Sequence, residues 1–201
     1  GTTTISITTP AGFVTSSNLQ SIVATVDAPN ITIGSATVGR DLQVGMSVFL
    51  ESAPPSPVTV TLTSDSGTIA TITKDGTLAG GTSLTFTNVT TTFVGTIFAQ
   101  GRALGNTTIT VTAPGYVNGV SNVTVDPSGF ILNAGNITTT AGAANTTLRV
   151  DAALLTPGTL IYSQSQLLRG GLTVNVPVTS SNTAVGTIVG TPSVVNPVDT
   201  L

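Results

Sequence analysis

Hydrophobic and polar residues alternate along much of this chain with a period of two. The pattern is clearest in Val58–Leu62, Ile109–Val111 and Val123–Val125, where threonine follows each apolar residue inside the run. Successive side chains of a β-strand point to opposite faces, so these runs predict strands with one face on a core and one in water. No segment shows a convincing helical period, and the chain is therefore expected to be all-β. The same alternation predicts further strands at Ile5–Ile7, Leu84–Phe86 and Leu172–Val176.

Turn-forming residues separate the alternating runs. Asp75-Gly76 lies between Ile69–Ile72 and Thr77–Leu78, which predicts a tight hairpin. Pro54–Pro57 predicts a stiff connection before the next strand. Short strands with regular turns predict antiparallel sheets packed as a sandwich. The expected core residues are Val44, Val48, Leu50, Val58, Val60, Leu62, Ile69, Ile72, Leu84, Phe86, Val94, Ile97, Phe98, Ile109, Val111, Val123 and Val125.

The chain also repeats itself. Pro10–Val14 returns as Pro127–Ile131, and Val58–Ile72 returns as Val174–Ile188, both displaced by almost the same number of positions. A constant displacement over such a distance is typical of tandem modules. We therefore expect residues 1–9 to be the last strand of a preceding repeat unit and residues 10–126 to be a complete sandwich. Residues 127–201 are then the first part of a second, incomplete sandwich.

Two segments carry a resemblance to a known family. Ser64–Leu78 combines a Ser-rich turn, an Ile-Ala-Thr-Ile strand and a turn that contains Gly, and Leu104–Ala113 follows with a Gly-Asn-Thr-Thr-Ile-Thr-Val strand. Together they resemble the bacterial immunoglobulin-like repeats of surface proteins, the group that includes invasin- and intimin-type stalks. The resemblance implies tandem immunoglobulin-like sandwiches. The stretch from Thr82 to Gly101 is longer than in compact members of that family, which leaves the number of strands there open.

The composition narrows the classes of function. Charged residues make up only 6% of the chain and the net charge is −3, while 41 Thr and 18 Ser supply most of the polarity. The five basic residues are scattered, so a nucleic-acid partner is not expected. The chain has no Cys and no His, which removes disulfides, zinc thiolates and the commonest general base. No apolar run reaches the length of a membrane span, so membrane insertion of this segment is not expected.

Little in the sequence points to chemistry. The eight acidic residues are scattered and form no calcium-binding pattern; Asp126, near the junction between units, is the best single candidate ligand. Lys74 is the only lysine that could form an intramolecular isopeptide bond, and it lies beside a turn. We expect no catalytic residue, no metal site and no cofactor, and hence no enzyme.

Sequons for N-glycosylation are the most testable feature. Six occur, a slight excess over what so Thr-rich a sequence generates by chance. Glycans at these positions would compensate for a surface that carries few charges. The possible acceptors are Asn30, Asn88, Asn106, Asn122, Asn136 and Asn145.

The sequence as a whole favours a mechanical role. We expect a structural segment of an extracellular stalk, fibre or filament at a cell surface, with copies of itself or neighbouring repeats as partners. Low charge on the strands leaves their edges open to strand addition between subunits, although neighbouring residues of the same polypeptide are the simpler partners. The alternative is an adhesin or carbohydrate-binding module that contacts glycans through its loops. Against this alternative, the chain has no Trp and only two Tyr.

Overall fold

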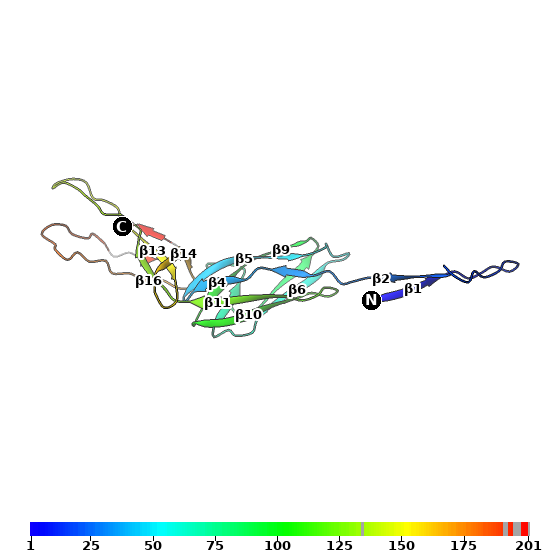
Figure 1. Cartoon of the computed structure of the whole chain (residues 1–201). Helices are drawn as coiled ribbons and strands as arrows, with labels where there is room; N and C mark the ends of the chain where they lie inside the picture. Colours follow the sequence, from blue (N-terminus) through cyan, green and yellow to red (C-terminus); the bar gives the residue numbers. More distant parts are fainter. Residues whose placement is uncertain (134, 191–192, 195–197, 201) are drawn as a thin grey trace.

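The computed structural model describes residues 1–133, 135–190, 193–194 and 198–200, and in these the chain is all-β with no helix (Figure 1). The prediction of an all-β fold is confirmed. The strands are β1 (Thr2–Ser6), β2 (Ser21–Thr25), β3 (Ile31–Ile33), β4 (Ala36–Gly39), β5 (Leu42–Leu50), β6 (Val58–Ser64), β7 (Ala70–Thr73), β8 (Ser83–Val89), β9 (Phe93–Gly101), β10 (Gly105–Thr112), β11 (Gly119–Asp126), β12 (Ser128–Leu132), β13 (Arg149–Leu155), β14 (Tyr162–Ser165), β15 (Leu167–Leu168), β16 (Val174–Asn175), β17 (Ser193–Val194) and β18 (Val198–Thr200).

Two five-stranded sheets form the centre of the molecule. One has the order β4-β11-β10-β6-β8, and the other joins β15, β5, β9 and β7, with β3 also on β5. All neighbouring strands in the two sheets are antiparallel except β4, which pairs in parallel with β11. The short stretch Gly34-Ser35 separates β3 from β4, and the two strands join different sheets. The start of the sandwich therefore ties both sheets together.

The alternating sequence explains why the sheets pack. In β6, Val60 and Leu62 are fully buried while Thr59 and Thr63 face water, and β11 buries Val123 and Val125 in the same way. One sheet thus offers a hydrocarbon face to the other, and burial of a Val or Leu side chain stabilises a fold by about 1.5–3 kcal/mol. The buried core cluster is Ile31, Ile33, Val38, Leu42, Met46, Val48, Leu50, Val60, Leu62, Ala70, Ile72, Val89, Ile97, Ala99, Ile109, Val111, Val123, Val125, Val150, Ala152 and Leu168.

The residues expected at the centre of the core are buried, which confirms that part of the prediction. Several residues expected in the core at its margin are only half-buried. Phe98 is half-buried and lies beside Gly76. The other expected residues that are only half-buried lie against the edge of the core cluster, where one flank of each side chain stays open to water. They are Val44, Val58, Ile69, Leu84, Phe86 and Val94.

The predicted tight hairpin at Asp75-Gly76 is wrong in detail. The chain turns there, but Thr77 and Leu78 form no strand, and β7 meets the returning chain only in the single bridge between Ile72 and Gly81. The Asp75 carboxylate accepts hydrogen bonds from the backbone N–H and the hydroxyl of Thr77, at 2.8 and 2.7 Å. This local turn closes before a two-residue hairpin can form.

The N-terminal strands lie apart from the sandwich. β1 and β2 form a two-stranded antiparallel hairpin at one end of the molecule, while the sheet of β12, β13 and β14 lies at the other end (Figure 1). The expectation that Ile5–Ile7 is half-buried on a core is wrong for this structure, since Ile5 and Ile7 are 56% and 66% exposed. The alternating pattern is present, but within the described residues its apolar face stays exposed.

Among the described residues, the second half of the chain shows small separate sheets and not a second pair of packed sheets. β13 pairs with β12, β14 and β18 in a separate sheet, and the expected strand at Leu172–Val176 shortens to β16. The equivalent stretches at Pro10 and Pro127 also differ, since the first enters the exposed turn of the hairpin and the second leads directly into β12. Two like sandwiches in tandem are therefore not confirmed, and the unit boundaries stay predictions. Within the described residues, no helix is long and apolar enough to cross a membrane.

Candidate functional site

The second half of the chain docks onto the sandwich through residues 164–172. We call the contact of this segment with β4 and β5 the junction. β15 pairs antiparallel with the start of β5, with Leu168 opposite Leu42 and Leu167 opposite Gln43. Leu168 and Leu42 are each only 2% exposed, so the segment contributes hydrocarbon to the core of the sandwich as well as backbone pairing. Backbone pairing and buried side chains therefore both hold this segment to the sandwich.

At the junction, the side-chain amide of Gln166 hydrogen-bonds to the backbone of β4 as a neighbouring strand would. Its side-chain oxygen accepts a hydrogen bond from the N–H of Gly39 at 2.8 Å, and its amide nitrogen donates to the carbonyl of Thr37 at 2.9 Å. Both partners belong to β4 and Gln166 is 8% exposed. Buried backbone groups must find partners, and here one side chain supplies a donor and an acceptor at once.

An ion pair closes the same contact at its rim. Arg169 Nε lies 2.8 Å from Asp41 Oδ1, and the backbone N–H of Arg169 donates to the Asp41 carbonyl at 3.0 Å. The Asp41 side chain is 45% exposed, so solvent screens the charge interaction and its contribution is at most about 1 kcal/mol. The ion pair serves mainly to fix the register of residues 164–172 against the sandwich.

Two buried glutamines join the junction to a turn on the other side of β5. Gln100 Nε2 donates to Gln43 Oε1 at 3.0 Å and to the Leu78 carbonyl at 2.8 Å, while Gln43 Nε2 donates to the Gly76 carbonyl at 2.7 Å. Gln43 Oε1 also accepts from the N–H of Gly170 at 3.3 Å. Because Gln43 and Gln100 are at most 2% exposed, these bonds form in a low-dielectric interior where each is stronger than it would be in water.

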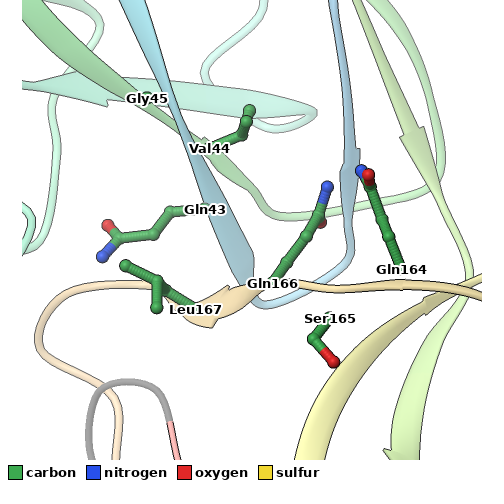
Figure 2. A pocket seen from close by; sticks show the side chains of 7 residues that line it. All are labelled: Gln43, Val44, Gly45, Gln164, Ser165, Gln166 and Leu167. Atoms are coloured by element: carbon green, nitrogen blue, oxygen red, sulfur yellow. The ribbon is translucent and has the colours of Figure 1, made fainter.

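A groove runs beside the junction. β15 pairs with Leu42 and Gln43 and β3 pairs with residues 48–50, so no described strand pairs with residues 44–47 on that edge of β5. Figure 2 shows Gln166 and Gln164 rising together from the chain before β15, with Gln43 and Leu167 on the other side of β5. The two connected hollows measure about 380 and 590 Å³. Their lining residues are Gly34, Ser35, Ala36, Thr37, Gln43, Val44, Gly45, Met46, Ser47, Gln164, Ser165, Gln166 and Leu167.

The six sequon asparagines are all exposed, but they differ in setting. Asn30 is engaged by Glu51, whose Oε2 accepts from the Asn30 side chain at 2.9 Å and from its backbone N–H at 2.7 Å. Asn88 has a left-handed backbone, with φ of 57°, near the end of β8. Asn136 and Asn145 lie outside the strands in the segment between β12 and β13. Exposure is what a glycan requires, and all six asparagines meet this requirement.

Two of the sequons face one another on the outer surface of β10 and β11. Asn106 pairs with Thr124, and Thr108 pairs with Asn122, so the two asparagines and their two sequon threonines form one cross-strand square. The Thr124 hydroxyl donates to Asn106 Oδ1 at 2.8 Å. Diagonal neighbours in an antiparallel pair lie about 7–8 Å apart. Two bulky substituents at Asn106 and Asn122 would therefore compete for one space.

The acidic residues are dispersed in the structure as in the sequence. No group of three or more His, Cys, Asp or Glu that could coordinate a metal occurs among the described residues. Asp126 ends β11, where its backbone carbonyl accepts from the Arg40 N–H at 2.9 Å. Asp151, 1% exposed, is paired with Arg149 at 2.7 Å and accepts from Asn133 at 2.6 Å. These contacts give the Asp126 backbone and the Asp151 carboxylate structural roles.

Lys74 is engaged by an aromatic ring. Its Nζ lies 4.4 Å from the centre of the Phe86 ring, a distance typical of a cation–π contact. Hydrogen bonds from the hydroxyl and the backbone N–H of Thr77 lower the pKa of the neighbouring Asp75 below its ordinary value. This turn is thus a local structural unit with a fully ionised carboxylate at neutral pH.

The six asparagines could be read from the sequence, but the junction could not. Gln43, Gln100 and Gln166 are three of the five glutamines of the chain, and all three are buried. Their burial was not visible in the period-two pattern, because a glutamine reads as a surface residue unless its partners are known. A comparison of the chain with protein-family models and with curated proteins finds no match.

Proposed function

We propose that this chain is a structural segment of an extracellular stalk, fibre or filament built from immunoglobulin-like sandwiches. The observation that carries the proposal is the layout of Figure 1: a sandwich with the N-terminal hairpin at one end and the β12–β14 sheet at the other. A unit whose two connecting regions lie at opposite ends adds its full length to a chain of such units. Stacked modules then sum to a long, thin object.

The topology supports the immunoglobulin-like assignment. The chain has two mainly antiparallel sheets around one core, and its opening strands β3 and β4 divide between the sheets. β11, the last strand before residue 126, pairs in parallel with β4 near the start of the sandwich. Hydrogen bonds between strands and the apolar core are enough to stabilise this arrangement. This suits a module that carries load and has no reactive site.

The surface supports an extracellular location. Thr and Ser, rather than ions, cover the outer faces of strands such as β6 and β10, so surface interactions depend little on pH and salt. All six sequons present an exposed asparagine, as N-glycosylation at a cell surface requires. Copies of the chain or neighbouring repeats are the partners that such a fibre needs.

Electron microscopy of native particles tests the proposal directly. We expect fibres or stalks with an axial repeat close to the length of the unit in Figure 1, and purified material that scatters X-rays as an elongated particle. Compact globular particles in both measurements would contradict a fibre or stalk role.

The groove beside β5 favours a second candidate, a carbohydrate-binding module. Amides and hydroxyls such as Gln164, Ser35, Thr37 and Ser47 line it, and these groups can hydrogen-bond to sugars. Neither hollow is lined by an aromatic ring on which a sugar could stack. A glycan array with the soluble chain distinguishes the two roles, since a purely mechanical segment binds no glycan selectively. A Gln164→Ala variant should then lose any selective signal.

A further inference from the structure

The N-terminal hairpin carries an apolar face that nothing in the structure covers. Ile5 lies directly opposite Ile22, and Thr3 lies opposite Ala24, so these residues share one face of the β1–β2 pair. Ile7, whose N–H donates to the Gln20 carbonyl at 2.9 Å, continues that face. Thr4 and Ser6 point to the opposite face. The hairpin is therefore amphipathic, with isoleucines on one side and mainly hydroxyl groups on the other.

The sandwich shows what the same pattern does when it has a partner. Val123-Thr-Val125 in β11 matches Ile5-Ser-Ile7 in alternation, yet its two valines are 0% and 1% exposed while the two isoleucines are 56% and 66% exposed. An isolated two-stranded hairpin is only marginally stable in water. The contrast indicates that β1 and β2 are completed by a surface outside their own part of the chain.

The exposed area is large enough for a specific contact. Seven apolar residues of the hairpin, leaving out Val23 on the opposite face, are exposed by 56% or more of their surface, and at on the order of 100 Å² each they present roughly 700 Å², close to the about 800 Å² per partner of a standard interface. Asp27 is the only acidic residue before Asn30, so little charge needs to be desolvated. The seven residues are Ile5, Ile7, Phe13, Val14, Leu19, Ile22 and Val26.

A matching surface lies at the other end of the molecule. β12 pairs with β13 on one side only, and no described strand pairs with its other edge. Its five residues carry no charge, whereas natural edge strands usually carry a Lys or another guard against strand addition. Beside it is an apolar groove of about 240 Å³, whose rim includes Phe130 and Leu132, 39% and 55% exposed. The groove is lined by Phe130, Ile131, Leu132, Val150, Val176, Pro177, Val178 and Thr179.

We propose that the β1–β2 hairpin of one copy adds to the free edge of β12 in a second copy, with Ile5 and Ile7 over the groove. Backbone hydrogen bonds to β12 would give affinity, and the apolar side chains would fix the register. Because donor and acceptor lie at opposite ends of the molecule, the contact is head-to-tail, the kind of interface that builds a filament when the rotation between copies does not close a ring. This inference rests on the proposed fibre role and specifies its subunit contact.

Single-cysteine variants test the contact, because the full chain contains no other thiol. Ile7→Cys supplies the donor, Leu132→Cys supplies the acceptor, and a short bis-maleimide joins thiols that lie side by side. We expect a mixture of the two variants to give a mixed dimer with a cross-link between residues 7 and 132, identified by mass spectrometry. The matched control is Ser6→Cys, one residue away on the opposite face, which should cross-link at least about fivefold less.

A second measurement does not depend on cross-linking. In sedimentation velocity, Ile5→Lys should weaken self-association by about tenfold or more, equivalent to at least 1.4 kcal/mol, whereas Thr4→Lys on the hydroxyl face should have little effect. The thermal unfolding of the sandwich should be the same in both variants, since no core residue is touched. That control separates loss of the contact from loss of folding.

Three results would overturn the inference. They are equal cross-linking of Ser6→Cys and Ile7→Cys, a dominant Ile7–Ile7 contact between two hairpins, and a wild-type chain that stays monomeric at every concentration. Fibres seen by microscopy together with any of these results would leave the mechanical role intact and remove only the hairpin contact. Globular particles would remove the mechanical role itself.

Discussion

At the scale of the residue, Gln100 has a role that its polarity alone would not suggest. Fully buried, it donates to Gln43 and to the Leu78 carbonyl and accepts from the Gly80 N–H at 2.8 Å. These bonds connect β9 to β5 and to the turn that follows β7. A buried polar group is stabilising only while all its partners are present, so this residue should tolerate substitution poorly.

Replacing Gln100 with leucine preserves its size and removes its hydrogen bonds. The Gly80 N–H and the Leu78 carbonyl then lose a partner, and we expect the free energy of unfolding to fall by about 2–4 kcal/mol. Urea denaturation measures this loss. Gln164→Leu, at an exposed position, is the control and should change stability by less than about 0.5 kcal/mol. Equal urea midpoints for the two variants would contradict the role assigned to Gln100.

The lowered pKa of Asp75 predicts how the stability of the fold depends on pH. Its pKa is lowered in the folded state by the hydrogen bonds from Thr77, so the folded protein binds a proton there less readily than the unfolded chain does. The contribution is therefore fully present above the unfolded pKa of about 3.9 and is lost as pH falls through the lower folded pKa. With no His in the chain, the melting temperature should be nearly constant from about pH 8 to pH 5 and fall below about pH 4. In Asp75→Asn the acid-side fall should be smaller, and an unchanged profile would refute this assignment.

At the scale of the element, Gly101 sets how closely β9 approaches β4. A Cβ at Gly101 would lie 2.4 Å from the backbone oxygen of Gly39 and 3.0 Å from a methyl group of Val125. Backbone cannot move aside as a side chain can. The close contact of the two sheets at this corner therefore requires glycine.

Gly101→Ala should be destabilising for this reason. We expect a cost of about 1–3 kcal/mol, measured by chemical denaturation, because the strands must separate to admit one methyl group. Gly45→Ala in β5 is the matched control, since its Cβ would meet Thr96 at an ordinary 3.8 Å. A destabilisation of the same size in both variants would point to a general loss of flexibility rather than to the close approach.

The paired sequons of β10 and β11 give a prediction at the same scale. When the chain is made in a host that glycosylates Asn-x-Thr, we expect molecules with a glycan on Asn106 to lack one on Asn122, and the reverse, because the two sites share one space. Glycopeptide mapping of the β10–β11 fragment reads both positions at once. Thr108→Val removes the Asn106 sequon and should raise occupancy of Asn122, while double occupancy in the wild type would contradict the prediction.

At the scale of the whole molecule, residues from beyond the predicted boundary at residue 126 take part in the sandwich. Leu168 and Gln166 lie within it, although they belong to residues 127–201. A chain that ends at Asp126 loses the burial of Leu168 and leaves the Gly39 N–H and the Thr37 carbonyl without Gln166. We expect it to be less stable than a chain that ends at Thr173 by about 3 kcal/mol or more. Thermal unfolding of the two fragments measures the difference, and equal stability would favour the boundary at residue 126.

Much of the sandwich could be predicted from the sequence. Val60, Leu62, Ile109 and Val123 are in strands and buried as expected, because alternation is a local property that a strand converts directly into two faces. Ile5 shows the limit of this reasoning, since its alternation gave the strand but not the partner that would cover it. Among the functional features, the positions of the six sequons could be read directly, but the facing of Asn106 and Asn122 required the register of β10 on β11.

The sequence by itself determined that this chain forms β-strands, which face of each strand is apolar, and that its exterior is hydroxyl-rich and poor in charge. These properties depend on residues close together in the chain. Only the tertiary structure decided that Gln166 caps Gly39 and that β15 joins β5, because these contacts join segments more than a hundred residues apart. Strand edges offer the same backbone groups everywhere, so the choice of partner depends on how the whole chain packs and not on the residues of either strand.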